Sequence, residues 1–268
     1  MNKYIKPIGI LVVLILLCAV LSQVFGSSET LYEYAKRTQE SHAVEESEAE
    51  SAETSAVTDE SSSEQAETDT ANDVTRSFYY EPLSEDIIQK ITGISYVEND
   101  NIALEELRYM HILHYNFDGE VTEGELICNE TIAQDLLEIF YELYLAEYRI
   151  EKVKLIDEYN GDDMASMKDN NTSCFNYRVV DGTTKLSKHA YGLAVDINPF
   201  YNPYVVFQSD GSTYISPEGS EPYTDREADF PYKINENDLC YQLFTEHGFT
   251  WGGSWNSCKD YQHFQKKG

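Results

Sequence analysis

Residues 187–198 read Ser-Lys-His-Ala-Tyr-Gly-Leu-Ala-Val-Asp-Ile-Asn, and this stretch decides the fold. The alternation in its second half predicts a strand from Leu193 to Ile197 whose apolar side chains face a core. The opposite face carries small residues and Asp196, which leaves open space in front of the carboxylate, as in a cleft. His189 precedes Gly192, where the chain can turn, so its imidazole can reach the same cleft.

A second segment near the C-terminus carries matching chemistry. Asp260 and His263 are separated by two residues and follow the glycine pair of Trp251-Gly252-Gly253. One Asp and two His ligands with water in the fourth position make a catalytic zinc set, and zinc lowers the pKa of that water to about 7. A second carboxylate that is not a ligand can take the proton from the water. Asp260 has the chemistry for this role.

The pattern Ser-x-His-x-x-Gly-x-Ala-x-Asp, followed far downstream by Asp-x-x-His, resembles the M15 metallopeptidases over roughly residues 100–265. This family includes the D-alanyl-D-alanine carboxypeptidases and dipeptidases. The resemblance implies an α+β, Hedgehog/DD-peptidase-like catalytic domain that cleaves cell-wall peptides. It also implies zinc (Zn2+) on His189, Asp196 and His263. Asp260 would be the base, and Arg178 the cation that stabilises the tetrahedral oxyanion.

The second motif departs from part of that family. The vancomycin-resistance dipeptidases and carboxypeptidases typically carry Glu-x-x-His, whereas Asp260 makes the motif Asp-x-x-His here. Asp-x-x-His with Trp-Gly-Gly is more similar to the branch of L-alanyl-D-glutamate endopeptidases and phage endolysins. The sequence therefore predicts a zinc peptidase acting on peptidoglycan stem peptides and leaves open whether it is a carboxypeptidase or an endopeptidase. The alternative is a non-catalytic, zinc-stabilised module that binds the cell wall or regulates other proteins.

Three further polar residues near these motifs are expected to contact substrate. They are Ser173, Ser187 and Tyr191. Ser187 as a hydrolytic nucleophile lacks a base other than the expected ligand His189, so a serine mechanism is not expected.

The N-terminal quarter of the chain has a different composition from the rest. In residues 1–26, two lysines precede an apolar run, which predicts a signal anchor with its N-terminus in the cytoplasm. A cleaved secretory signal is the alternative. Residues 27–75 are rich in Ser, Glu, Ala and Thr and predict an acidic disordered linker. Residues 76–268 then form the peptidase domain, on the extracytoplasmic face of the membrane or secreted.

The net charge of the 268-residue chain is −29. Binding to nucleic acid needs clustered Lys and Arg that displace counterions from phosphates, so we expect no nucleic-acid partner. The expected partners are peptidoglycan stem peptides and, through the N-terminal segment, the membrane.

Helical and alternating patterns predict a mixture of helices and short strands without a βαβ rhythm, hence an α+β domain. The expected helices are Ser84-capped 85–90, Asn129-capped 131–147 and an Asn235-capped helix that ends at Gly248. The expected strands are 107–117, 124–128, 151–156, 175–180, 193–197, 249–251 and 261–264, with polar loops at 160–172 and 201–233.

The remaining cysteines and histidines have no clear ligand spacing. No two cysteines form Cys-x-x-Cys, so zinc on cysteine is not expected. Export permits disulfides, with Cys240–Cys258 the first pair to test, and free buried cysteines are the alternative. His111 and His114 would point to opposite faces of a strand and are therefore expected to be structural.

Overall fold

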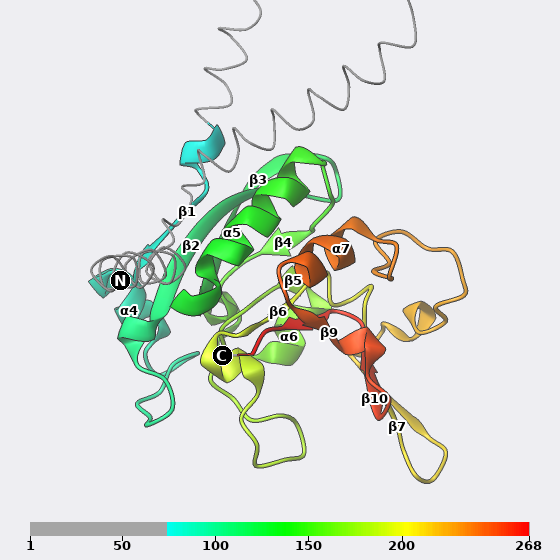
Figure 1. Ribbon diagram of the computed structural model, residues 1–268. Helices are drawn as coiled ribbons and strands as arrows, with labels where there is room; N and C mark the ends of the chain where they lie inside the picture. The colour runs from blue at the N-terminus through cyan, green and yellow to red at the C-terminus, as the bar shows by residue number, and fades with distance from the viewer. Residues whose placement is uncertain (1–73, 268) are drawn as a thin grey trace, which may run out of the picture. The chain divides into compact units, whose positions relative to one another are not determined.

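The computed structural model describes residues 74–267. The helices and strands of this part are mixed along the chain (Figure 1), which confirms the expected α+β class. The predicted anchor and most of the predicted linker lie outside the described residues. Within the described part, no helix is both long enough and apolar enough to cross a membrane.

The N-terminal half is a three-stranded antiparallel sheet covered by one helix. The strands run in the order β1 (Tyr79–Pro82), β2 (Leu107–Tyr115) and β3 (Val121–Asn129). Asn129 ends β3 and caps helix α5 (Glu130–Leu145), because its side chain accepts a hydrogen bond from the backbone N–H of Thr131. The apolar face of α5 is buried, and the helix lies along this sheet (Figure 1).

The C-terminal half carries two small antiparallel sheets. One has the order β6 (Ala194–Asp196), β11 (His263–Gln265) and β9 (Thr250–Trp251). The other has the order β10 (Cys258–Asp260), β7 (Tyr204–Phe207) and β8 (Thr213–Ser216). Since β10 and β11 are joined by only two residues, the two sheets meet at the Asp260–His263 segment.

The remaining elements are short and connect these sheets. They are α4 (Glu85–Ile91), β4 (Lys152–Val153), α6 (Asp163–Lys168), β5 (Asn171–Thr172), α7 (Leu239–Glu246) and the 3-10 helices η1 (Leu104–Glu106), η2 (Ile156–Tyr159), η3 (Lys188–Tyr191), η4 (Glu221–Tyr223) and η5 (Gly252–Ser254). Asp135 of α5 links the two halves: it accepts from Lys266 at 2.7 Å and pairs with His247 at 3.2 Å.

Most elements with a strong periodic pattern lie where the sequence predicts them. The helices capped by Ser84 and Asn129 are confirmed, as are the strands around β2, β3, β6, β9 and β11. The last helix begins later than predicted, because Asp238 rather than Asn235 caps it. The predicted strand 151–156 shrinks to the two residues of β4.

Three expectations are wrong. The region 160–172 is not only loop, since it contains α6 and β5. The region 201–233 contains the β7–β8 hairpin. Residues 175–180 form no strand, because successive backbone N–H groups bond to different segments: Phe175 to Ile127, Asn176 to His189, and Tyr177 to Ser95.

The described cysteines form no disulfide, and the two histidines of β2 lie away from the candidate metal ligands. Cys128, Cys174, Cys240 and Cys258 are free, so the structure favours the free-thiol alternative over the Cys240–Cys258 bridge. His111 and His114 lie on opposite faces of β2. Each pairs with a backbone carbonyl, that of Ser77 at 2.6 Å and that of Ile150 at 2.8 Å, respectively.

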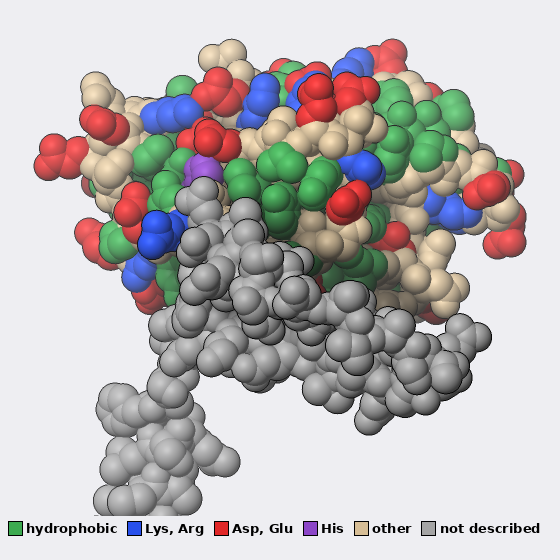
Figure 2. All heavy atoms as spheres, turned by 90° about the horizontal axis from the view of Figure 1, so that it is seen from above, with side chains coloured by type: hydrophobic (Ala, Val, Ile, Leu, Met, Phe, Trp, Pro, Cys, Tyr) green, Lys and Arg blue, Asp and Glu red, His purple; other side chains and the backbone are tan. Residues whose placement is uncertain are grey.

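Charged side chains of both signs are scattered over one face of the described part. Figure 2 shows Lys and Arg lying among Asp and Glu, with apolar side chains between them. On this face the basic side chains do not gather into the stripe that nucleic-acid binding needs, in line with the net charge of −29.

A substitution at Gly192, the turn that ends η3, tests how tightly this turn packs against the end of β3. The Gly192 φ of +64° is left-handed, and a Cβ there would lie 2.6 Å from the backbone nitrogen of Asn129. We expect Gly192→Ala to lower the free energy of unfolding by about 2–5 kcal/mol, from the left-handed backbone and the clash together. Gly211→Ala is the matched control, because its φ is +86° and nothing lies within 4 Å. It should cost only about 1–2 kcal/mol in denaturant titrations. Equal losses for the two variants would contradict this.

Candidate metal centre

Three short elements bring two histidines and one aspartate together. His189 lies on η3, and its backbone N–H is capped by the Ser187 hydroxyl, which accepts a hydrogen bond of 3.3 Å. Asp196 ends β6 and His263 begins β11, and the antiparallel register places these two residues opposite each other. Directly opposite side chains in an antiparallel pair lie close together on the same face. The sheet register therefore sets the distance between two of the three side chains.

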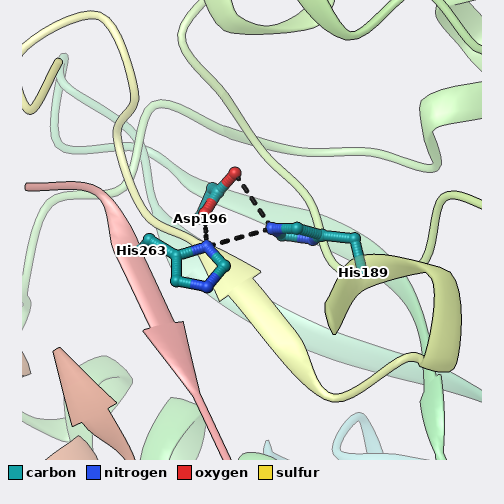
Figure 3. Close-up of side chains that lie close together, drawn as sticks. All are labelled: His189, Asp196 and His263. Atoms are coloured by element: carbon teal, nitrogen blue, oxygen red, sulfur yellow. Dashed lines mark hydrogen bonds and ion pairs between the residues drawn. The ribbon is translucent and has the colours of Figure 1, made fainter. Parts of the chain in front are cut away.

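The donor atoms of these residues converge on one point (Figure 3). His189 Nε2 lies 3.2 Å from His263 Nδ1 and 3.2 Å from Asp196 Oδ2, and His263 Nδ1 lies 2.9 Å from Asp196 Oδ1. Ligands about 2.0–2.1 Å from a tetrahedral zinc ion lie about 3.3 Å from one another. The three residues are only 3–5% exposed. Both the donor types and their spacing fit a metal ion with one open position.

The other nitrogen of each imidazole faces a hydrogen-bond acceptor. His189 Nδ1 lies 2.5 Å from the backbone oxygen of Cys174, and His263 Nε2 lies 3.1 Å from Gln265 Oε1. Neutral imidazole carries one N–H, which these acceptors hold on the outer nitrogen. The inner nitrogens, His189 Nε2 and His263 Nδ1, then keep free lone pairs for a metal. Acceptors of this kind orient metal-binding histidines in many proteins.

The charges of this cluster are strongly coupled. Burial disfavours the Asp196 carboxylate, but the charge of His189 and the hydrogen bonds of both histidines hold the pKa of Asp196 well below its ordinary value. Burial likewise disfavours a charged His263, but the hydrogen bond and charge of Asp196 raise the pKa of His263 to about 9. A buried carboxylate here needs positive charge beside it, whether a proton or a metal ion supplies it.

Asp260 lies beside this cluster at the end of β10. Burial raises the pKa of Asp260 to about 6. Its Oδ1 is buried without a hydrogen-bond partner among the described residues. Gly252 lets the chain approach: a Cβ there would lie 2.6 Å from the Asp260 backbone oxygen and 3.3 Å from the His263 Cβ. Gly252, the first glycine of the Trp-Gly-Gly segment, therefore allows η5 to lie against Asp260 and His263.

Arg178 lies in the irregular segment between β5 and η3 and lines the same cavity as the candidate ligands. Its Nη2 forms an ion pair with Asp163 Oδ2 at 2.6 Å, and its Nε is buried without a partner in the described chain. Burial opposes the charge of Arg178, but the carboxylates of Asp163 and Asp196 raise its pKa, so it stays a cation. Asp163 was missed by the sequence analysis, although the Asp162 cap followed by a helical pattern was a signal for α6.

A cavity of about 660 Å3 opens onto these side chains. Its lining includes the three candidate ligands together with Asp260, Arg178, Asp163, Ser187, Lys188, Tyr191, Trp255 and Gln262. Two of the expected substrate contacts, Ser187 and Tyr191, thus face this space. The expected substrate contact Ser173 is not among the residues that line it. Its backbone pairs with the backbone of Asp196 through hydrogen bonds of 3.2 and 3.0 Å, which hold that end of β6 in place.

A comparison with protein families agrees with the motifs. The M15 family model described as D-alanyl-D-alanine carboxypeptidase matches residues 181–266, which include the His189, Asp196, Asp260 and His263 positions. The match supports the predicted M15 resemblance over this segment, which is about a third of the chain. Comparisons with curated proteins and with solved structures gave no match.

Metal binding provides a direct test of the three candidate ligands. We expect the purified protein to bind one zinc ion, and His189→Ala and His263→Ala to abolish this binding. Zinc at 100 times its dissociation constant should add about 2.7 kcal/mol to stability, which a chelator reverses. His111→Ala is the control, because its ring pairs with the backbone of Ser77 instead. Metal analysis and calorimetric titration measure the zinc content and the zinc affinity, and thermal unfolding with and without chelator measures the stability. Full zinc binding by His263→Ala would contradict the assignment of His263 as a ligand.

The Gln265 side chain should tune metal affinity without touching the metal. Gln265→Leu removes the acceptor for His263 Nε2. We expect zinc affinity to fall about 10- to 100-fold, as for other outer hydrogen-bond partners of metal ligands. Gln265→Glu keeps an acceptor and should restore most of the affinity.

The control for this prediction is Gln208→Leu, since Gln208 is exposed and lies beyond β7. Chelator competition should give it the wild-type zinc affinity. An unchanged affinity in Gln265→Leu would show that the Gln265 amide does not orient His263.

Proposed function

We propose that this M15 family peptidase hydrolyses peptidoglycan stem peptides with a zinc ion held by His189, Asp196 and His263. One observation carries the proposal: the ligand atoms of three buried residues lie 2.9–3.2 Å from one another, in a cavity beside a carboxylate that has an unpartnered oxygen among the described residues. Catalytic zinc sites have this arrangement of three protein ligands and an open position. We further propose that the domain has the Hedgehog/DD-peptidase-like fold.

The bound zinc would supply Lewis acidity, lowering the pKa of a water molecule to about 7 and polarising the scissile carbonyl. Asp260 takes the proton from the attacking water. Because burial raises its pKa only to about 6, Asp260 is largely ionised at neutral pH and can accept that proton. The same carboxyl group then delivers the proton to the leaving amine. Asp260 lines the cavity and its Oδ1 has no hydrogen-bond partner among the described residues, so the carboxylate is available for both transfers.

Arg178 stabilises the negative charge that forms on the carbonyl oxygen during attack. It is a cation on the wall of the same cavity, and its Nε has no partner in the described structure. The ion pair with Asp163 fixes the guanidinium before substrate arrives. Preorganised donors of this kind stabilise the transition state because they need no rearrangement.

The cavity is large enough for a segment of peptide. Its volume of about 660 Å3 falls within the range of about 300–1,000 Å3 that is usual for ligand sites. Ser187 and Tyr191 are proposed substrate contacts, since both line it. The apolar run and acidic stretch of residues 1–75 support a membrane-anchored or secreted enzyme that works on the wall side of the membrane.

Loss of the base should abolish turnover while leaving the metal in place. We expect Asp260→Asn to reduce hydrolysis of defined muropeptides about 10²- to 10⁴-fold at unchanged zinc content. Asp210→Asn is the control, because Asp210 is exposed and bonds only locally to Ser212. Mass spectrometry of the products measures both the rate and the bond cleaved.

The products of that assay also separate the two peptidase classes. Release of terminal D-alanine identifies a carboxypeptidase, and cleavage between L-Ala and D-Glu identifies an endopeptidase. Wild-type protein that is fully loaded with zinc and yields no product would favour a wall-binding or regulatory module instead. Wild-type activity in Asp260→Asn would contradict the assignment of the base.

A further inference from the structure

Three buried polar atoms around the cavity have no hydrogen-bond partner in the described part of the chain. They are Arg178 Nε, Asp260 Oδ1 and Gln262 Oε1, and all three residues line the cavity. Arg178 and Asp260 already have proposed roles in the reaction. Gln262 has none, although it lies between the base and a candidate metal ligand in the sequence.

Gln262 is held firmly at its position. The residue is only 2% exposed, and its backbone oxygen accepts a 3.0 Å hydrogen bond from Ile197 N. The side-chain nitrogen lies 3.5 Å from Met167 Sδ, which is a weak acceptor. The side chain thus extends from the β10–β11 connection to α6, and its carbonyl oxygen has no donor among the described residues.

The contacts of the amide show which of its ends is free. Its nitrogen lies 3.5 Å from Met167 Sδ, and a thioether sulfur can only accept a hydrogen bond, so the nitrogen is the end that faces Met167. Oε1, an acceptor, is then the end without a partner among the described residues, on a side chain that lines the cavity.

Burying an acceptor without a donor is unfavourable, and native proteins rarely do so outside functional sites. The three unpartnered atoms are one donor and two acceptors, which is the complement of a peptide chain with its alternating C=O and N–H groups. An amide oxygen cannot bind a carbonyl or a carboxylate, since neither offers a hydrogen. Its ligand must carry an N–H or O–H group.

We propose that Gln262 Oε1 accepts a hydrogen bond from a backbone N–H of the bound peptide, next to the scissile bond, and so positions the substrate. The proposal rests on the peptidase function proposed above and adds a residue that binds the backbone of the substrate. The contribution of Gln262 lies in substrate binding and orientation.

Depsipeptides test this contact directly. In each analogue, an ester oxygen replaces the N–H of one peptide bond flanking the scissile bond. We expect the zinc-loaded full chain to bind one of the two analogues about 3- to 10-fold more weakly than the all-amide peptide, judged by KM. Gln262→Met, which keeps the length but not the acceptor, should bind that analogue and the amide peptide equally well.

The controls separate this contact from general damage. Met167→Leu alters the packing around Gln262 but keeps its oxygen, so it should retain the wild-type preference for the amide. Zinc content and the unfolding temperature show whether each variant is folded. If wild type cleaves the amide peptide and both esters with the same KM, Gln262 is satisfied by solvent only and the inference is overturned while the peptidase function stands. If wild type cleaves none of the peptides, the proposed function fails, and the inference with it.

Discussion

The pairing of β6 with β11 is the constraint on which the rest of the site depends. It sets Asp196 opposite His263, although the two residues are 67 positions apart in the sequence, and places His263 Nδ1 2.9 Å from Asp196 Oδ1. A slip of one residue would turn one of these side chains to the opposite face of the sheet. The third ligand, His189, reaches the same point only because Gly192 turns the chain directly before β6. One strand register and one left-handed turn therefore build the candidate metal centre.

Packing on the opposite face of the sheet maintains that register. Phe264, the neighbour of His263, is fully buried and stacks on Phe244 of α7 at 4.4 Å. Val195, the neighbour of Asp196, is also fully buried. Because strand side chains alternate, burying these two apolar residues forces both ligands toward the cavity. The hydrophobic core thus supplies the free energy that holds two polar side chains in a buried position.

The same alternation explains how much of the site the sequence predicts. The small and apolar residues around Asp196 have a period of two, and the helix after Asn129 has a cap and an apolar face, so both are readable locally. Residues 175–180 have no such pattern to read, since their backbone groups bond to three separate segments. Asp163 was missed for a related reason: its importance comes from Arg178, fifteen residues away and brought near only by the fold. Contacts that are set by tertiary structure leave no local signal.

The balance of charge around the cavity explains why this site suits a divalent cation. The cavity lining carries four carboxylates against three basic side chains, namely Asp163, Asp181, Asp196 and Asp260 against Arg178, Lys185 and Lys188. The hydrogen bond and charge of Asp196 raise the pKa of His263 to about 9, so without further positive charge His263 carries a proton at neutral pH. That proton occupies the lone pair a metal would use, so proton and metal compete for one position. Under the proposed function, a zinc ion there would carry twice the charge of the proton and would leave Asp260 free to act as the base.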